Sequence, residues 1–350
     1  MAMADITVMG AGIFGLSVAW ACLKRGASVQ VVEKDHAGAG SSGGIVGALA
    51  PHVPDTWDTK KAFQLESLLM AEAFWAEVAA VSGISPGYAQ TGRLQPIGNE
   101  RLLQQAYDRV PTSKEFWQGR AEWRIIDAAQ AGAWAPQSGS GFLIFDTLAA
   151  RINPRLATQS LAKAVEAKGA TFITADARTV TPGGAVVWAT GYQGLYELSD
   201  EFEKPAGNGV KGQSALLAFD ARDRPQLFAD AIHIVPHENG TVAIGSTSER
   251  YFDDPSSTDD QLDDVLARAR TAFPVLENAA VLERWAGVRP RGKTRAPMLG
   301  HYPGRDGQYI ANGGFKIGFG MAPMVGETMA ELILNDVDRI PTLFKVEANL

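Results

Sequence analysis

The sequence predicts an α/β protein of two domains, one built on a parallel sheet and the other an α+β domain built on an antiparallel sheet. Three observations support this fold class. A strand, a glycine-rich turn and a helix follow one another over residues 5–24, and a second strand, glycine-rich loop and helix occupy residues 309–333. Between these units, residues 209–245 form short alternating runs separated by turns, which is typical of antiparallel strands.

Length, composition and charge exclude several classes of protein. A chain of 350 residues with 46% hydrophobic and 20% charged residues is an ordinary globular protein, long enough for two domains. The formal net charge of −7 argues against a nucleic-acid partner. Cys22 is the only cysteine, so no intrachain disulfide can form, and we expect it to be buried in the first helix. No apolar run is long enough to span a bilayer, and no basic segment of a signal peptide opens the chain, so we expect a soluble, cytoplasmic protein without a metal site.

The first motif organises the rest of the chain. Gly10, Gly12 and Gly15 form G-x-G-x-x-G between an apolar strand and a helix. The first glycine permits a tight turn, the second leaves room for a pyrophosphate beside the backbone, and the third lets helix and strand approach closely. The next strand, 28–32, ends at Glu33, whose carboxylate can accept hydrogen bonds from both hydroxyls of a ribose. This complete order predicts a dinucleotide site rather than a chance glycine turn.

The following elements are predicted from periodicity and capping residues. The glycines of residues 37–52 indicate backbone held against the same ligand, the alternative being a flexible surface loop. Helical spacing predicts a helix over 60–81, and Asn153 as cap with Pro154 at the first position predicts another that stops at Gly169. Residues 83–141 contain a strand near 92–97, a helix near 100–110 and several tryptophans that we expect to be exposed.

The second half of the chain returns to the parallel sheet twice. Strands at 171–173 and 185–191 belong to it, with room between them for no more than a very short hairpin. Antiparallel strands at 214–219, 231–236 and 241–245 come next, and a helix over 259–273 has aspartates at its start and arginines near its end, as the helix dipole favours. The closing glycine-rich junction suits the far end of a ligand longer than a nucleotide. The expected division is 1–85, 142–208 and 286–350 for the nucleotide domain and 86–141 and 209–285 for the substrate domain.

Six segments together resemble the FAD-dependent D-amino-acid oxidase superfamily, and bacterial glycine oxidases most nearly, over almost the whole chain. They are Gly10–Gly15, Glu33–Lys34, Ser41–His52, Ala189–Gly191, Trp285–Pro290 and Gly313–Ala330. The resemblance implies a Rossmann-type, glutathione-reductase-like domain that binds FAD, and it implies a small amine or amino acid as substrate. We expect non-covalent FAD, since the flavin loop has no cysteine, and His52 is the one residue considered as a tether.

The resemblance also implies which residues hold FAD. Ile13 and Phe14 would lie at the pyrophosphate, Glu33 and Lys34 at the ribose, and the backbone of Arg178 at the adenine. Residues 46–48 would pass the flavin ring and residues 314–320 would surround the ring and the ribityl chain. The implied set is Gly10, Gly12, Ile13, Phe14, Gly15, Glu33, Lys34, Ser41, Ser42, Val46, Gly47, Ala48, Arg178, Gly191, Gly314, Phe315, Lys316, Ile317, Gly318, Phe319 and Gly320.

For the substrate, Arg289 matches the family arginine that grips a carboxylate, and a guanidinium fork suits that task. His233 stands where a tyrosine is usual and either donates to the carboxylate, adding a titration near neutral pH, or is structural. Ser248 stands where an apolar residue is usual, and His52 is placed in the same set. Lys316 either stabilises reduced flavin or faces solvent. A basic cluster of surface charges, which could instead recognise a second acidic group, consists of Arg291, Lys293 and Arg295.

The predicted function is oxidation of the CH–NH bond of a small amino acid or N-substituted glycine. A hydride passes to flavin N5, water hydrolyses the imine to an oxo acid and an amine, and oxygen is reduced to hydrogen peroxide. No catalytic base is assigned. The alternatives are a dehydrogenase that uses a quinone or carrier protein, an oxidase acting on a carboxymethylaminomethyl group of modified tRNA, and a flavoprotein without enzymatic activity. The sequence leaves the oligomeric state open.

Overall fold

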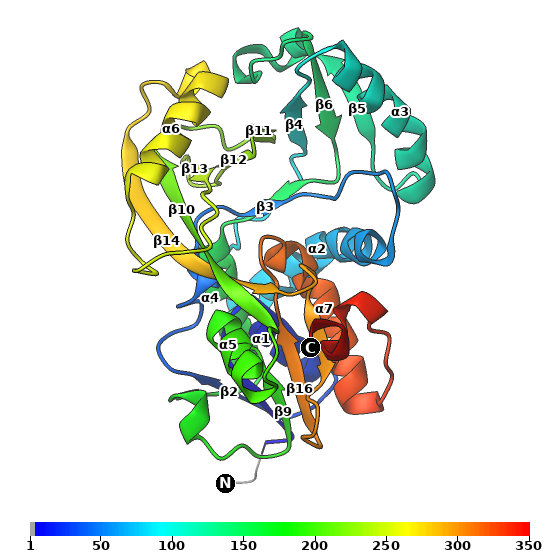
Figure 1. Cartoon of the computed structure of the whole chain (residues 1–350), viewed down its shortest axis with the longest axis vertical. Coiled ribbons are helices and arrows are strands. Elements are labelled where there is room, and N and C mark those ends of the chain that lie inside the picture. Colours follow the sequence, from blue (N-terminus) through cyan, green and yellow to red (C-terminus); the bar gives the residue numbers. More distant parts are fainter. Residues whose placement is uncertain (1–3) are drawn as a thin grey trace.

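The computed structural model describes residues 4–350 and confirms the predicted α/β fold class, with two large sheets and helices packed around them (Figure 1). One sheet has the strand order β15-β16-β9-β1-β2-β8, and all of its pairs are parallel except that between β15 and β16. The strands of this sheet are β1 (Ile6–Met9), β2 (Val29–Glu33), β8 (Thr171–Thr174), β9 (Ala185–Trp188), β15 (Met298–His301) and β16 (Gln308–Asn312).

The second sheet has eight strands in the order β14-β10-β13-β12-β11-β4-β6-β5, and only the β11–β4 pair is parallel. A short pair, β3 (Ala48–Leu49) with β7 (Ala150–Arg151), lies apart from both. The strands of the large sheet are β4 (Arg93–Pro96), β5 (Trp123–Asp127), β6 (Phe142–Asp146), β10 (Gly207–Leu217), β11 (Gln226–Ala229), β12 (Ile232–Pro236), β13 (Val242–Gly245) and β14 (Val281–Gly292).

The helices lie where the periodicity places them, and three were not predicted or were predicted too short. The full set is α1 (Ile13–Lys24), α2 (Thr59–Ser82), α3 (Glu100–Phe116), α4 (Pro154–Ala167), α5 (Gly191–Glu201), α6 (Asp260–Ala272), α7 (Gly318–Asn335) and α8 (Val346–Asn349). Sequence rules end α3 before Pro111, but the helix continues through it to Phe116, although an interior proline removes a hydrogen bond and crowds the preceding turn. Helix α5 starts at Gly191, the residue at which the predicted strand over 185–191 ends. The third, α8, is a single turn near the C-terminus.

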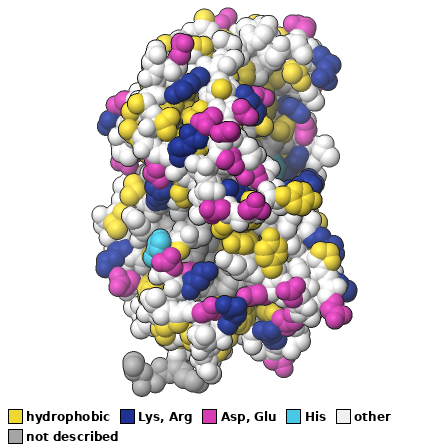
Figure 2. All heavy atoms as spheres, turned by 60° about the vertical axis from the view of Figure 1, so that its left-hand side comes forward, with side chains coloured by type: hydrophobic (Ala, Val, Ile, Leu, Met, Phe, Trp, Pro, Cys, Tyr) yellow, Lys and Arg dark blue, Asp and Glu magenta, His cyan; other side chains and the backbone are white. Residues whose placement is uncertain are grey.

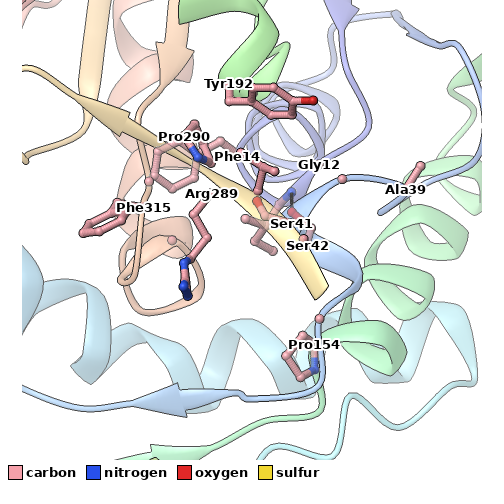
Figure 3. A pocket seen from close by; sticks show the side chains of 18 of the residues that line it. Gly12, Phe14, Ala39, Ser41, Ser42, Pro154, Tyr192, Arg289, Pro290 and Phe315 are labelled. Atoms are coloured by element: carbon pink, nitrogen blue, oxygen red, sulfur yellow. Dashed lines mark hydrogen bonds between the residues drawn. The ribbon is translucent and has the colours of Figure 1, made fainter. Parts of the chain in front are cut away.

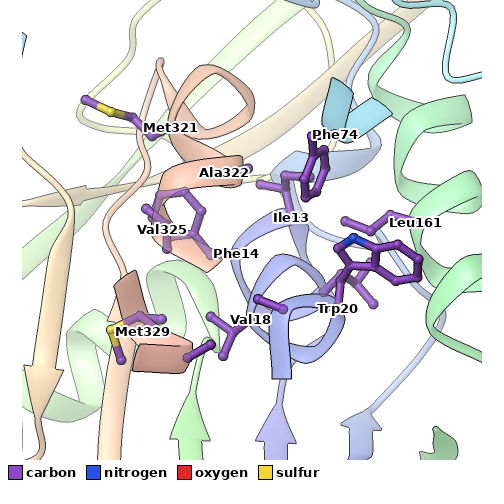
Figure 4. Close-up of a cluster of buried hydrophobic side chains, with 14 of the residues drawn as sticks. Ile13, Phe14, Val18, Trp20, Phe74, Leu161, Met321, Ala322, Val325 and Met329 are labelled. Atoms are coloured by element: carbon purple, nitrogen blue, oxygen red, sulfur yellow. The ribbon is translucent and has the colours of Figure 1, made fainter. Parts of the chain in front are cut away.

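Helix α1 is the centre of the main core. It packs between α7 and α4, with Phe14 and Val18 lying toward α7 and Trp20 toward Leu161 of α4 (Figure 4). Because neighbours cover it on several sides, almost all of α1 is buried and its sequence is apolar all round. A Cβ added at Gly15 would lie 2.1 Å from the carbonyl oxygen of Gly10, so a glycine is needed for the strand-to-helix contact, as the motif predicts. This contact fixes where the N-terminus of α1 points.

One expectation for the fold is corrected. The tryptophans of residues 83–141 are buried, and Trp117 packs edge to face against Trp123 with ring centroids 6.3 Å apart. The short connection between β8 and β9 contains a 3₁₀ turn, Ala177–Thr179, within the limited room that the sequence leaves there. The twelve-residue strand β14 lies where no element was predicted from the sequence. Pairing along the whole of β10 imposes the extended conformation.

Strands β10 and β14 extend from beside α6 toward the middle of the molecule and contact α5 as well as their own sheet (Figure 1). The boundaries expected at residues 208–209 and 285–286 therefore fall inside continuous strands. We keep the division into a nucleotide domain and a substrate domain as a proposal, with these two strands shared between them. Among residues 4–350, no helix combines the length and apolarity needed to cross a membrane.

Candidate active site

One cavity of about 800 Å³ runs from the carboxyl ends of the parallel strands to the face of the antiparallel sheet. Its walls come from the start of α1, the loop over residues 39–48, the start of α5, strand β14 and the loop over residues 314–320. Figure 3 shows Gly12 and Ser42 at one side of this space and Arg289 and Phe315 at the other. Ligands of open α/β sheets bind at the carboxyl ends of the strands, which is where this cavity begins.

The helices that start at the cavity differ from the others in their caps. Helices α2, α3, α4 and α6 each have a side chain that accepts a hydrogen bond from their first turn, from Asp58, Asn99, Asn153 and Asp259 respectively. Helices α1, α5 and α7 have no such bond from the residue at their own N-cap, and no acid lies in their first turns; at α1 the N–H of Ile13 is bonded instead to Ser42 of a neighbouring loop. The positive dipole ends of these three helices border one cavity, which suits an elongated anionic ligand such as a dinucleotide.

The nucleotide end is built around Glu33 at the end of β2. One carboxylate oxygen accepts a hydrogen bond from the backbone N–H of Ala11 at 2.9 Å, which ties the acid to the glycine turn. Ser42 accepts from the backbone N–H of Ile13 at 2.9 Å and so holds the loop over residues 39–48 against the start of α1. Arg178 lines this end, but its side chain pairs with exposed Asp176 at 2.6 Å. The site is therefore held in shape by contacts among its own residues.

Arg289 reaches the other end of the cavity from the last third of β14. Its guanidinium donates to Ser246 Oγ at 2.9 Å and to the carbonyl oxygen of Thr247 at 2.8 Å, while Nε is buried without a partner in the described structure. No acid lies within ion-pair distance among residues 4–350. Burial lowers the pKa of Arg289 to about 10, so the group is still a cation at neutral pH. A half-buried cation without a paired anion is a binding site for one.

A buried polar cluster holds the strand segment behind Arg289. Thr247 donates to the carboxylate of Glu249, which lies 3.8 Å from the ammonium of Lys211, and Gln213 donates to the same carboxylate at 3.1 Å. Opposite the guanidinium, Gly212 leaves the space that Arg289 fills, since a Cβ there would lie 1.7 Å from Nη2. The position of the guanidinium is thus fixed from two strands, β10 and β14, and from the segment after β13.

His233 lies on β12 and lines the cavity beside Phe228, with ring centroids 4.6 Å apart. Its Nδ1 is buried and has no partner within the described residues. Burial, with Arg93 and Lys316 adding repulsion, lowers the pKa of His233 to about 3. The titration near neutral pH that the sequence suggested is therefore absent, because the ring stays neutral there.

Replacing His233 by Gln should consequently leave the shape of the pH profile of kcat/KM unchanged between about pH 5 and 8, since neither side chain changes charge in that range. The measurement is kcat/KM at half-unit steps of pH for both proteins. An inflection near pH 6.5 that only the wild type shows would contradict the neutral state.

Most of the predicted site residues line this cavity, and four do not. Gly15 faces the strand, Ile317 packs at the start of α7, Ser248 is exposed, and His52 instead contacts Gln64 on α2. The predicted residues that line the cavity are Gly10, Gly12, Ile13, Phe14, Glu33, Lys34, Ser41, Ser42, Val46, Gly47, Ala48, Arg178, Gly191, His233, Arg289, Gly314, Phe315, Lys316, Gly318, Phe319 and Gly320.

Sequence reasoning missed several residues of the wall. Tyr192 follows the carboxyl end of β9, a position that could have been flagged from the strand alone. Ser246, rather than the expected Ser248, contacts Arg289. The alternation of side chains along a strand cannot distinguish the two serines, because residues two apart point to the same face. Phe228 pairs directly with His233 across β11 and β12, which only the register reveals.

A family model described as FAD dependent oxidoreductase matches residues 5–332 of the chain. The chain belongs to this family. This FAD-dependent oxidoreductase is 25% identical over 370 residues to the glycine oxidase of Bacillus licheniformis, covering 95% of this chain and 93% of that protein. It is 27% identical over 368 residues to the glycine oxidase of Pseudomonas aeruginosa, covering 94% of each.

Solved structures show the same fold. The glycine oxidase of Geobacillus kaustophilus superposes with a TM-score of 0.86 at 21% identity over 99% of both chains. The iminodiacetate oxidase of Chelativorans sp. BNC1 gives a TM-score of 0.85 at 20% identity, covering 97% of this chain and 98% of that one. At these identities the likeness of the structures establishes the architecture alone.

FAD fits the cavity of this FAD-dependent oxidoreductase. The starts of α1 and α7 lie on its wall, and Glu33 stands at one end where a ribose would bind. Cys22 is buried in α1 with its thiol pKa raised by burial to about 12, so it offers no thiolate to a flavin. Bound FAD supplies the acceptor for a two-electron oxidation.

Proposed function

We propose that this enzyme oxidises the CH–NH bond of a small amino acid or an N-substituted glycine. The observation that carries the proposal is Arg289, a cation without an ion pair in the described structure, placed on the wall of the cavity that fits FAD. A guanidinium fork binds a carboxylate through two parallel hydrogen bonds. The names of the relatives support the same chemistry, because glycine and iminodiacetate both carry a carboxylate one carbon away from the amine.

The roles of the residues follow from their positions. Arg289 would bind the carboxylate and so orient the substrate. Gly212 provides the space for the guanidinium, and the carbonyl oxygen of Thr247 accepts a hydrogen bond from it. Bound FAD would supply the hydride acceptor for the carbon beside the amine; the imine would then be hydrolysed to an oxo acid and an amine, and oxygen would take up the two electrons as hydrogen peroxide. The four acids that line the cavity all lie at the nucleotide end: Glu33, Asp35, Asp176 and Glu197. No general base is therefore assigned, and the substrate would react with a neutral amine.

Anaerobic mixing of the yellow holoenzyme with glycine, sarcosine, N-substituted glycines and D-amino acids tests the proposal. We expect at least one of them to bleach the visible absorbance of the flavin, and admission of air to restore it with formation of hydrogen peroxide. If bleaching occurs but air restores the colour only slowly, while a quinone restores it at once, the enzyme is a dehydrogenase. If no amine bleaches a flavin that dithionite can reduce, the proposal is wrong.

The flavin should be held without a covalent bond. Cys22 is buried in α1, and His52 is engaged by Gln64 outside the cavity wall, so neither sequence candidate reaches the flavin. Acid precipitation of the holoenzyme should therefore release yellow flavin into the supernatant. Colour that stays with the pellet after washing would show a tether, and mass spectrometry of tryptic peptides would then locate it.

A further inference from the structure

Charges on the cavity wall are divided between its two ends. The acids and two of the basic residues, Lys34 and Arg178, belong to the nucleotide end, where Asp176 pairs with Arg178. The other end has two basic side chains, Arg289 and Lys316, and no acid of the described chain lines it. One cation is enough to bind one carboxylate. A substrate such as glycine, which has a single carboxylate, would therefore leave the second cation without an anionic partner.

Lys316 is fixed close to Arg289 by the backbone. The N–H of Phe315 donates to the carbonyl oxygen of Pro290 at 2.9 Å, which binds the loop over residues 313–316 to the strand that carries Arg289. The ammonium of Lys316 lies 5.8 Å from the centroid of the Phe315 ring, and no hydrogen-bond acceptor or acid within residues 4–350 pairs with it. The residue is exposed at the cavity wall, and partial desolvation together with the nearby Arg289 lowers the pKa of its ammonium. An anion between the two cations would relieve their repulsion.

The basic cluster suggested by the sequence is not the source of this charge. None of Arg291, Lys293 and Arg295 lines the cavity, and Lys293 donates to the carbonyl oxygen of Leu350. The guanidinium of Arg291 lies 5.8 Å from the centroid of the Phe315 ring, outside the lining of the cavity. The residue that can touch a second acidic group is therefore Lys316.

We propose that the enzyme takes secondary amines with two carboxylates, the N-carboxymethyl amino acids, and that Arg289 binds one carboxylate while Lys316 binds the other. This inference rests on the proposed function. For the simplest member, iminodiacetate, one N–CH₂ group loses a hydride and the nitrogen loses a proton to give the imine, and water then cleaves the C=N bond to glyoxylate and glycine. One oxygen molecule accepts the two electrons and becomes hydrogen peroxide, so the reaction needs no further reactant.

Binding can be tested without turnover, with two sulfur analogues that have no amine to oxidise. Thiodiglycolate carries two carboxylates and (methylthio)acetate carries one, and each is titrated into the holoenzyme while the flavin absorbance is followed. We expect thiodiglycolate to bind about 10-fold more tightly or better, and Lys316→Met to reduce that preference to about 2-fold or less, because the long apolar side chain keeps the volume and removes the charge. Lys316→Arg should retain the preference. Lys293→Met, outside the cavity, should match the wild type.

Turnover separates this inference from the function on which it rests. Iminodiacetate is compared with its monoamide, which has the same shape and one carboxylate fewer, and with sarcosine. If sarcosine and the monoamide reduce the flavin as efficiently as iminodiacetate, the function holds and the diacid inference is wrong. The inference is also overturned if Lys316→Met slows all three equally, because Lys316 then acts on the flavin. If none of the three reduces the flavin while glycine or a D-amino acid does, the diacid inference is wrong and the proposed function stands; if no amine reduces it, both are wrong.

Discussion

Arg289→Ala should raise KM for the true substrate by roughly 30- to 4,000-fold, the equivalent of about 2–5 kcal/mol for removing one partner of a desolvated charge pair. The reason is that Arg289 is the cation that would meet the substrate carboxylate, and its fork is already positioned by Ser246 and Thr247. The measurement is steady-state kinetics with the substrate that bleaches the flavin. An unchanged KM would show that Arg289 does not bind the substrate.

Two further variants distinguish the charge of Arg289 from its position. Arg289→Lys keeps the cation but loses the fork, so part of the affinity should return relative to alanine. Gly212→Ala leaves the arginine in place and pushes its guanidinium away, since the added Cβ would lie 1.7 Å from Nη2. We expect Gly212→Ala to cost about 100-fold in kcat/KM with FAD content unchanged, as misplacements of about 1 Å do in other enzymes.

Gly12→Val should lower the affinity for FAD by about 100-fold or more, because the side chain would project into the space of the cofactor, and overpacking costs up to about 3 kcal/mol. The fold itself does not require glycine there. The φ of −80° and ψ of 177° suit any residue, and an added Cβ would meet only Ser42 Oγ, at 3.3 Å. The loss should therefore appear in the ratio of flavin to protein and in reconstitution with added FAD.

The control for Gly12→Val is Gly98→Val, at an exposed position outside the cavity where an added Cβ meets only the end of Leu102 at 3.8 Å. This variant should bind FAD as the wild type does. The apo forms of both variants should unfold within about 1 kcal/mol of the wild-type apoprotein. A Gly12→Val protein that keeps its full complement of FAD would show that the pyrophosphate does not approach this turn.

Basic and acidic side chains are mixed over the face of the molecule shown in Figure 2, and the formal net charge is −7. A polyanion needs a continuous basic surface to release its counterions, and that face offers none. The positive charge that the chain concentrates lies instead on the cavity wall, at Arg289 and Lys316.

Local sequence patterns were enough to predict much of the nucleotide end of the cavity. The glycine motif, the helix it starts and the acid twenty residues on follow one another in the sequence, and each is specified by its immediate neighbours. The caps Asn153 and Asp259 likewise act within one turn and mark the starts of α4 and α6 as predicted. Arg289 was identified through a resemblance to known proteins, and its place on the cavity wall agrees with that assignment.

The arrangement of side chains at the substrate end of the cavity depends on strand register, which no local sequence pattern predicts. The alternation of side chains along a strand predicts that Ser246 and Ser248 share a face. Only the position at which β13 ends explains why Ser246 contacts Arg289 while Ser248 is exposed. No strand was predicted over residues 281–292 from the sequence, and the pairing of β14 with β10 is what brings Gly212 opposite Arg289.

The sequence by itself therefore determined the fold class and the dinucleotide turn, because the patterns that indicate them lie within a few residues of each other along the chain. The tertiary structure alone decided which cations share the cavity, that His233 is neutral, and that Lys316 rather than the cluster at residues 291–295 stands beside Arg289. The physical reason is that burial and charge at a point are sums over strands far apart in the chain, and only the folded backbone brings those strands together.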